Sequence, residues 1–152
     1  ALNGALTVGT YDGANIEIRE AVGADNFYLF GLREEQIQEM RKNNAYNPRA
    51  CYENSEYLRR ILNAVNSNMF CEKDYVLLFK VIYEELLNRD YYFLLADLEA
   101  FNKALHDAEK DYTNPQKWAK KAIINVAKIG YFSSDRAVME YAKTIWHIKP
   151  VD

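Results

Sequence analysis

Cysteine, proline and histidine are scarce in this sequence, and their scarcity narrows the possible chemistry. The chain has two cysteines, three prolines and two histidines among its 152 residues. Cys51 and Cys71 have no histidine near them, so the chain has neither the ligand spacing of a zinc site nor the pattern of a disulfide framework. We therefore predict no metal site and two reduced, mostly buried thiols, as in a cytoplasmic protein.

Long apolar runs and an excess of one charge are also missing. The longest apolar stretches, around residues 75–87 and 91–95, are interrupted by Lys80, Glu84 and Glu85, and they fall short of the roughly eighteen residues that span a bilayer. Nineteen basic residues are scattered among 22 acidic ones, giving a net charge of -3. No broad basic face is left for a phosphate backbone. Neither membrane insertion nor nucleic-acid binding is predicted.

The composition is that of one folded domain. Apolar residues make up 49% of the chain and charged residues 27%, which is typical of globular proteins. The first residues are not preceded by an initiator Met and pass directly into a strand-and-turn pattern, so we expect the chain to be part of a larger folded unit. We predict a single partial domain over residues 1–152, with a strand-helix-strand remnant at 1–31 and a helical region at 32–152.

The N-terminal part alternates strand, helix and strand. Residues 6–8 are apolar and β-prone between glycines, and residues 27–30 form a second short aromatic strand. Between them, Asp12 or Asn15 can cap a helix that Gly23 ends. Two short parallel strands joined by a helix predict an α/β fold.

The remaining residues predict six or seven helices, so the fold class is α/β but predominantly helical. Asn47-Pro48 and Asn114-Pro115 each place a capping side chain before a proline that suits a first helical turn. The helix after Pro48 is expected to break near Ser55. We expect one helix to start at Asp97 and the next to end at Gly130. The last helix is expected to start at Ser133 or Ser134 and to be closed by Pro150.

The stretch from Asp74 to Leu87 is apolar almost all round. A helix that is apolar on every side is normally buried on every side. We therefore predict that this helix is the most buried one in the chain.

Three glycines near the first strand suggest a phosphate-binding loop. Gly4 and Gly9 have the P-loop spacing, but Thr10-Tyr11 replaces the lysine and hydroxyl residue that would contact phosphate and magnesium. Tight turns and close backbone packing at Gly4, Gly9 and Gly13 are the favoured interpretation.

The other motifs also have structural interpretations. Asp12 and Glu17, with Glu20, could suggest a catalytic carboxylate pair, but helix capping and first-turn charge explain Asp12 and Glu17. His106 and His147 are isolated, and solvated or helix-end positions are expected. Residues 133–136 are expected to form the N-cap and first turn of a helix. Arg136 is expected to pair with a carboxylate or a carbonyl. Twelve tyrosines, including Tyr91-Tyr92, could offer a sugar-stacking platform, although half-buried packing is favoured.

Several strings of residues resemble one enzyme family. They are Asn3-Gly4-Ala5-Leu6-Thr7, Gly9-Thr10, Asp12-Gly13-Ala14-Asn15 with Glu17, residues 26–32, Asn114-Pro115 with Trp118, and residues 130–136 followed by Tyr141-Ala142 and Ile145-Trp146. The strings closely resemble the glycogen, starch and maltodextrin phosphorylases, the α-glucan phosphorylases, and they span nearly the whole chain. The middle, from Glu34 to Lys110, resembles the family more in helical pattern.

The resemblance implies a fold and an activity for the longer protein. The family has a two-domain glycosyltransferase fold of the GT-B type, and this chain would be the C-terminal part of its second Rossmann-like half. The family cleaves α-1,4-glucans with inorganic phosphate to give glucose 1-phosphate, and it uses pyridoxal phosphate bound to a lysine. That lysine would lie just before Ala1, so no catalytic or cofactor-binding residue is assigned here. The chain alone is expected to bind no cofactor and to be inactive.

The resemblance also implies partners and leaves alternatives. The remainder of the phosphorylase chain is the expected partner, with glucan and phosphate bound through the intact enzyme. Val8 and residues 27–30 are expected to expose apolar surface and an unpaired sheet edge, which would favour self-association. A stand-alone helical protein-interaction module is the alternative function. A nucleotide-binding α/β fragment would need a lysine after Gly9, or an acidic residue that ends a second strand in the ribose-binding register, and the sequence has neither.

Overall fold

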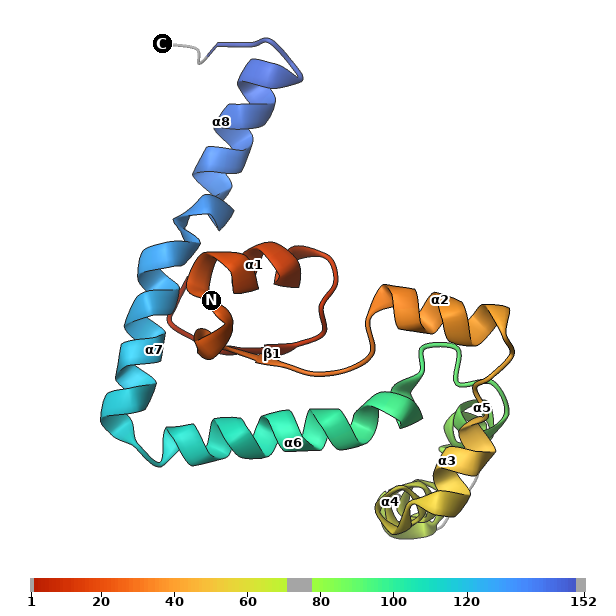
Figure 1. Cartoon of the computed structure of the whole chain (residues 1–152). Helices are drawn as coiled ribbons and strands as arrows, with labels where there is room; N and C mark the ends of the chain where they lie inside the picture. The colour runs from red at the N-terminus through yellow and green to blue at the C-terminus, as the bar shows by residue number, and fades with distance from the viewer. Residues whose placement is uncertain (1, 71–77, 150–152) are drawn as a thin grey trace. The chain divides into compact units, whose positions relative to one another are not determined.

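The computed structural model describes residues 2–70 and 78–149 (Figure 1). Its contacts divide the chain into two compact units. Unit 1 comprises Ala1–Leu29 and Ala104–Asp152, and unit 2 comprises Phe30–Lys103. The long helix α6 (Leu94–Tyr112) contributes residues to both. The single domain expected over residues 1–152 stays a prediction.

Unit 1 contains the strand-helix-strand segment that the sequence predicts. Strand β1 (Thr7–Gly9) pairs in parallel with β2 (Phe27–Leu29), with Thr7 opposite Phe27 and Gly9 opposite Leu29. Parallel strands need a crossover, which helix α1 (Ala14–Val22) and a short 3-10 turn (Ala24–Asn26) supply. The predicted fold class is therefore confirmed: the described residues are mostly helical with two short parallel strands.

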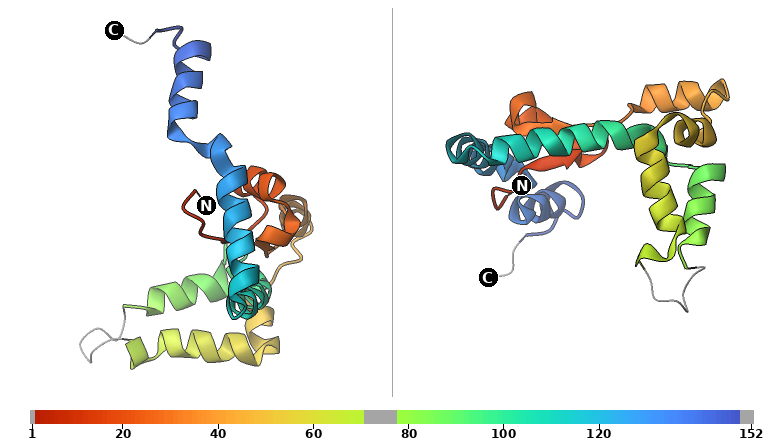
Figure 2. Two further views of the ribbon diagram at one scale, coloured as in Figure 1. Left: turned by 90° about the vertical axis from the view of Figure 1, so that its left-hand side faces the viewer. Right: turned by 90° about the horizontal axis from the view of Figure 1, so that it is seen from below.

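The core of unit 1 lies beside these strands. Val22, Phe27 and Ile129 are buried together, and four half-buried side chains surround them, those of Ile18, Leu29, Ile124 and Phe132. Ile124 comes from helix α7 (Pro115–Lys128), and Ile129 and Phe132 come from the 3-10 turn Ile129–Phe132. Figure 2 shows α7, in cyan, running beside α1. Helix α8 (Ser134–Thr144) follows.

The expected exposure of the strands is wrong for β2. Phe27 is 5% exposed and Tyr28 8% exposed, because side chains from α1 and α7 cover them. Val8 is half-buried. The apolar surface that was expected to promote self-association at β2 is thus already covered within unit 1, and self-association stays a prediction.

Capping of α1 differs from the expectation. The residue before the helix is Gly13, and no side chain caps the helix. Instead, the Asn15 N-H donates to the Asp12 carbonyl at 3.1 Å, while the Asp12 carboxylate accepts from the Thr10 hydroxyl at 2.9 Å. The predicted stop at Gly23 is confirmed, because its φ of 87° is one that glycine adopts readily.

Unit 2 is a set of helices around a leucine core. Its elements are α2 (Glu34–Lys42), α3 (Pro48–Asn54), α4 (Glu56–Asn66), a 3-10 turn (Asn68–Phe70), α5 (Lys80–Asn88) and the first turns of α6. Figure 2 shows α4 and α5 side by side. The buried core comprises Leu58, Leu62, Leu87 and Leu95, with Cys51, Tyr52, Tyr83, Leu86 and Leu98 packed against it.

The predicted caps beside proline and the break near Ser55 are confirmed. The Asn47 side chain accepts from the Ala50 N-H at 3.2 Å, and in unit 1 Asn114 accepts from the Lys117 N-H at 3.1 Å. Ser55 separates α3 from α4, and its hydroxyl accepts from the Leu58 N-H at 3.3 Å. Each of these bonds satisfies a backbone donor that a helix start leaves free.

The prediction that the helix at Asp74–Leu87 is the most buried one is wrong. Residues 74–77 lie outside the described residues, and α5 begins at Lys80. Leu78, Val81 and Ile82 are 60%, 72% and 50% exposed, whereas Leu87 is 5% exposed. The helix packs on α3 and α4, while Val81 and Ile82 stay open to solvent.

The cap of α6 is Asp90 rather than Asp97. The Asp90 carboxylate accepts from the backbone N-H groups of Leu94 and Leu95 at 2.9 and 2.8 Å, and the Tyr46 hydroxyl also donates to it. Asp97 lies inside α6, where it accepts from the Leu32 N-H at 2.8 Å. Burial raises the pKa of the Asp97 carboxyl above its usual value.

We expect Asp90→Asn to destabilise the protein by about 1 to 3 kcal/mol, because Asp90 is 2% exposed and its charge serves three donors. Asparagine tolerates the left-handed φ of 33° at this position, so the change tests the charge and not the backbone. Denaturant unfolding measures the loss. Asp135→Asn, on the exposed first turn of α8, is the control, and equal stability of both variants would contradict the role of Asp90.

Candidate functional site

The glycines of the N-terminal motif serve backbone geometry, as predicted. Gly4 and Gly13 have φ of 81° and 48°, in the left-handed region. Gly9 is constrained differently, because a Cβ there would lie 2.8 Å from Asn15 Nδ2 and 3.3 Å from Phe27 Cζ. The close approach of β1 to α1 and β2 therefore requires a residue without a side chain.

We expect Gly9→Ala to destabilise the protein by about 1 to 3 kcal/mol, the usual cost of overpacking. The added methyl group must displace both the Asn15 and Phe27 side chains, and Phe27 is part of the core. Gly130→Ala is a matched control, because a Cβ there meets nothing within 4 Å. A shift of the melting temperature for Gly9→Ala alone is expected. The steric argument fails if both variants melt together.

A buried charged cluster joins β2, α6 and α7 in unit 1. Asp111 Oδ2 accepts from the Tyr28 hydroxyl at 3.0 Å and lies 2.9 Å from Lys121 Nζ. The Lys117 ammonium group binds the other oxygen, Oδ1. The side chains of Asp111 and Lys121 are only 10% and 11% exposed. Lys121 also donates to the Asp25 carbonyl, just ahead of β2, and its Nζ lies 4.6 Å from the Tyr28 ring centroid.

The cluster shifts the pKa values of its members in opposite directions. The hydrogen bond from Lys117 is the largest cause that lowers the pKa of Asp111, to about 2, with burial opposing and Lys121 and Tyr28 assisting. Burial, and then the hydrogen bond to the Asp111 carboxylate, raise the pKa of Tyr28 above its ordinary value. At neutral pH the carboxylate is charged and the phenol is protonated, which is the arrangement that the hydrogen bond needs.

The sequence argument missed this cluster. Lys117 and Lys121 are one helical turn apart, and that spacing was the available signal. Tyr28 is 83 positions from Asp111, so only the fold shows that they meet. All the groups of the cluster are occupied by one another, which suits a support better than an acid or base.

The cluster also decides how the residues here fit pyridoxal phosphate. A Schiff base needs an uncharged lysine amine, whereas the ammonium groups of Lys117 and Lys121 both bind the Asp111 carboxylate. We therefore assign the cofactor to neither of these two lysines, which are paired with Asp111. No step through the cofactor is assigned to this chain.

We expect Asp111→Asn to lower stability at pH 7 by about 1 to 3 kcal/mol, the scale of a charged hydrogen bond. The Asp111 pKa is about 2 in the folded protein, below the unfolded value of about 3.9. Its contribution is therefore complete above about pH 4 and is lost as the pH falls through about 2. Unfolding measured from pH 7 to 2 should show a smaller acid loss in the variant, and parallel curves would contradict this.

A second buried contact holds the segment that enters β1. The Asn125 side chain on α7 is 0% exposed, and its Nδ2 donates to the Ala5 carbonyl at 3.0 Å. A Cβ at Gly4 would lie 3.5 Å from Val126 Cγ2 and 3.7 Å from the Ala122 Cβ, which is ordinary contact. Residues 4 and 5 therefore lie directly on α7.

The remaining predicted motifs are not brought together as a site. Arg136 binds the Tyr131 carbonyl and the Glu140 carboxylate, which confirms its predicted pairing. Ser133 precedes α8, but its side chain makes no capping bond. His106 lies 3.7 Å from Glu109, and both side chains are 77% exposed, so its solvated position is confirmed. Glu17 lies in the first turn of α1.

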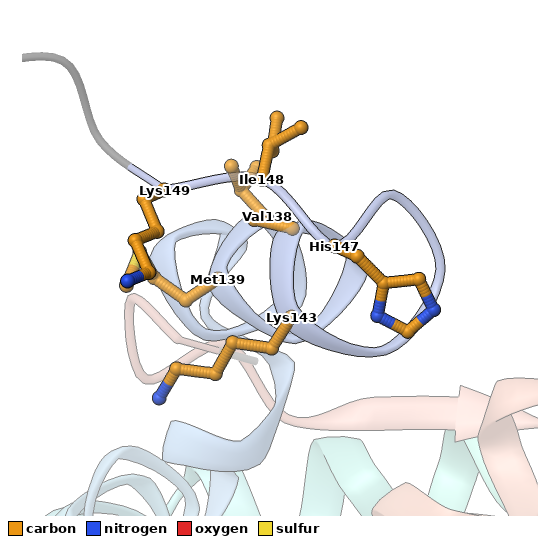
Figure 3. A pocket seen from close by; sticks show the side chains of 7 residues that line it. Val138, Met139, Lys143, His147, Ile148 and Lys149 are labelled. Carbon is orange, nitrogen blue, oxygen red and sulfur yellow. The ribbon is translucent and has the colours of Figure 1, made fainter.

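Two cavities lie outside these contacts. One, of about 560 Å³, is formed by α8 and the residues after it, and Figure 3 shows His147 and Lys143 at its edge. Its lining is Val138, Met139, Ala142, Lys143, His147, Ile148 and Lys149. The other, of about 210 Å³, lies in unit 2. Within residues 2–70 and 78–149, no three acidic, cysteine or histidine side chains converge as a metal site would require.

The cavity of unit 2 involves the tyrosines. Arg41 donates to the Tyr91 carbonyl at 2.8 Å and lies over the Tyr91 ring, 4.6 Å from its centroid. Tyr46 stacks on Phe93 with 4.3 Å between ring centroids. Tyr91 and Tyr92 are 63% and 73% exposed, so the predicted half-buried packing is wrong for this pair. Both rings lie in the loop between α5 and α6 and are open to solvent.

The structure describes one of the two cysteines. Cys51 is a half-buried free thiol, and burial raises its pKa above the ordinary value. The buried thiol predicted at Cys71 lies outside the described residues. The helices built from the described residues are all too short or too polar to span a bilayer.

Comparison with known proteins identifies the family. The model of the carbohydrate phosphorylases matches residues 1–148. The chain belongs to this family. A glycogen phosphorylase of Synechocystis is 44% identical over 99% of the chain, one of Bacillus subtilis is 41% identical over 99%, and the human brain form is 40% identical over 99%.

The match covers only part of each family member. The chain spans 18% of the length of the Synechocystis and human proteins and 19% of the Bacillus protein. The contacts described above are thus those of one part of a carbohydrate phosphorylase. Within unit 1 they hold β1, α1 and β2 against α7, through Asp111 on one side and Asn125 on the other.

Proposed function

We propose that this chain is the C-terminal part of an α-glucan phosphorylase. The intact enzyme would use inorganic phosphate to cleave α-1,4-glucan and release glucose 1-phosphate, and it would work in the cytoplasm. The observation that carries this proposal is the family match over residues 1–148, together with relatives named glycogen phosphorylase at 40 to 44% identity. Pyridoxal phosphate would be held by a lysine that precedes Ala1 in the longer protein.

Within the intact enzyme, this chain would have a supporting role. Gly9, Asp111 and Asn125 each fix part of the segment between Gly4 and Leu29 at a separate point. A strand that enters from a catalytic turn must be held rigidly, because a displacement of about 1 Å can cost a hundredfold in rate. The chain would therefore act through the precision with which it holds the polypeptide ahead of it.

Exposed apolar faces favour the rest of the phosphorylase as the partner. Val81 and Ile82 on α5 are 72% and 50% exposed, and Ile145 and Trp146 after α8 are 61% and 57% exposed. Neighbouring apolar side chains that together form an exposed patch mark interaction surfaces, and the relatives are more than five times as long as this chain. The same faces would suit the alternative, a helical interaction module, but 44% identity along 99% of the chain favours the enzyme.

The activity test compares the full-length protein that contains this sequence with the isolated chain. The full-length protein is expected to release glucose 1-phosphate from maltodextrin only when inorganic phosphate is present. The isolated chain is expected to release none, because the resemblance puts the cofactor lysine ahead of it. Coupled assay of glucose 1-phosphate measures both. A full-length protein without phosphate-dependent release would overturn the proposed function, and activity of the isolated chain would overturn its supporting role.

A further inference from the structure

The cavity of unit 2 lies where α2 and α5 end and α6 begins. Its volume is about 210 Å³, which is below the roughly 300 Å³ at which pockets for drug-sized molecules begin. Three aromatic and four polar side chains line it, together with Met40. A cavity of this size and lining suits one small ring that carries hydrogen-bonding groups.

The Arg41 side chain in the wall of this cavity is held in place but keeps most of its donors. It donates to the Tyr91 carbonyl at 2.8 Å and lies over the Tyr91 ring. A guanidinium group has five N-H donors, and among the described residues Arg41 makes this one hydrogen bond and pairs with no carboxylate. The Asn44 amide has no hydrogen-bond partner within the same residues. Both side chains can therefore donate to a ligand.

The opposite wall of the cavity is rigid. Asp90 is 2% exposed, and its carboxylate accepts from two backbone N-H groups of α6 and from the Tyr46 hydroxyl. Tyr46 stacks on Phe93, which is 4% exposed. Asn44, Asp90 and Phe93 all have left-handed φ, of 49°, 33° and 60°, which is uncommon for residues other than glycine. Strained backbone of this kind gathers at ligand sites.

The charges around the cavity balance one another. Arg41 and Arg89 contribute two positive charges, while the Asp90 carboxylate lies in the wall and Glu85 lies 3.4 Å from Arg89 Nε. Both α2 and α5 end at the cavity, and the C-terminal end of a helix carries partial negative charge. A free anion such as phosphate would therefore gain little here. The lining favours an uncharged ligand with several hydroxyl groups.

We propose that the cavity binds one ring of a carbohydrate chain. The C-H face of the sugar packs on the Tyr91 ring, which is 63% exposed with Arg41 in place. The sugar hydroxyls accept hydrogen bonds from Arg41 and Asn44. Tyr92, which is 73% exposed and 5.1 Å from Tyr91 between ring centroids, offers a surface for the next sugar ring. That the sugar is a glucose unit of an α-glucan rests on the proposed function.

A crystal structure of the full-length protein soaked with maltose gives the direct test. We expect a sugar ring with carbon atoms within about 4.5 Å of the Tyr91 ring. We also expect a sugar hydroxyl within about 3.2 Å of the Arg41 or Asn44 side chain. A cavity that stays empty at high maltose concentration would overturn the proposal. So would a soak in which inorganic phosphate binds between Arg41 and Arg89 and maltose does not.

Variants of the full-length protein test the site in solution. Retardation of the protein in native gels that contain maltodextrin measures the affinity without phosphate and hence without cleavage. In Tyr91→Ala we expect the affinity to fall about threefold to tenfold, because one stacking face is lost. Tyr131→Ala is the matched control: Arg136 donates to the Tyr131 carbonyl and lies over its ring in the same way, and the ring is 58% exposed. Its affinity should stay within about twofold.

Asn44→Gly is a second variant that leaves the aromatic wall intact. Glycine adopts the left-handed φ of this position readily, so the change removes the amide alone, and we expect the affinity to fall about twofold to tenfold. Unchanged affinity in both cavity variants, or an equal loss in Tyr131→Ala, would contradict the site. If the wild-type protein lacks phosphorolysis, the proposed function fails, while the maltose soak and the gel retardation still decide whether the cavity binds a sugar.

Discussion

Unit 1 depends on a carboxylate that is buried without losing its charge. Burial of an isolated charge costs many kcal/mol, and it is tolerated when partners with opposite charge and hydrogen-bond donors surround it. Asp111 has two ammonium groups and a phenol around it, and these come from α7 and β2. Because two donors lie on α7 and one lies on β2, a shift of either element removes part of the pairing that stabilises the buried charge. The need to keep the Asp111 carboxylate paired therefore helps to fix the position of the parallel strands β1 and β2.

The features that could be predicted from sequence are those whose interacting atoms are close in the chain. Asn47 and Asn114 cap helices because their side-chain oxygens reach N-H groups three residues on. The left-handed stop at Gly23 follows from the same local logic. In each case the geometry is set by a few backbone angles, so residue type and spacing are sufficient.

The predictions that proved wrong concern positions where another feature of the fold overrides the local sequence pattern. Asp97 looks like a helix start, but Asp90 takes that role because the backbone adopts left-handed φ at Asp90 and at Phe93, with values of 33° and 60°. An aspartate or a phenylalanine in the sequence does not by itself predict a positive φ. For α5, apolar residues on all sides predict burial, yet the pattern does not specify which partner buries each side, and Val81 and Ile82 are 72% and 50% exposed.

The support of β1 and β2 lay beyond sequence reasoning for a different reason. Asn125 and Ala5 are 120 positions apart, and Tyr28 and Asp111 are 83 apart. Each residue, taken alone, has an ordinary interpretation as a helix or strand residue. Their importance comes from being buried together, which only a folded chain defines.

Trp118 places a fluorescent side chain next to the charged cluster around Asp111. The indole makes an edge contact with Tyr112, with 5.1 Å between ring centroids, and it follows directly after Lys117. Tyr112 is adjacent in sequence to Asp111, so the ring pair and the carboxylate occupy the same junction of α6 and α7. Any loosening of that junction changes the surroundings of the indole, and the fluorescence of Trp118 therefore reports on the packing of α6 against α7 beside Asp111.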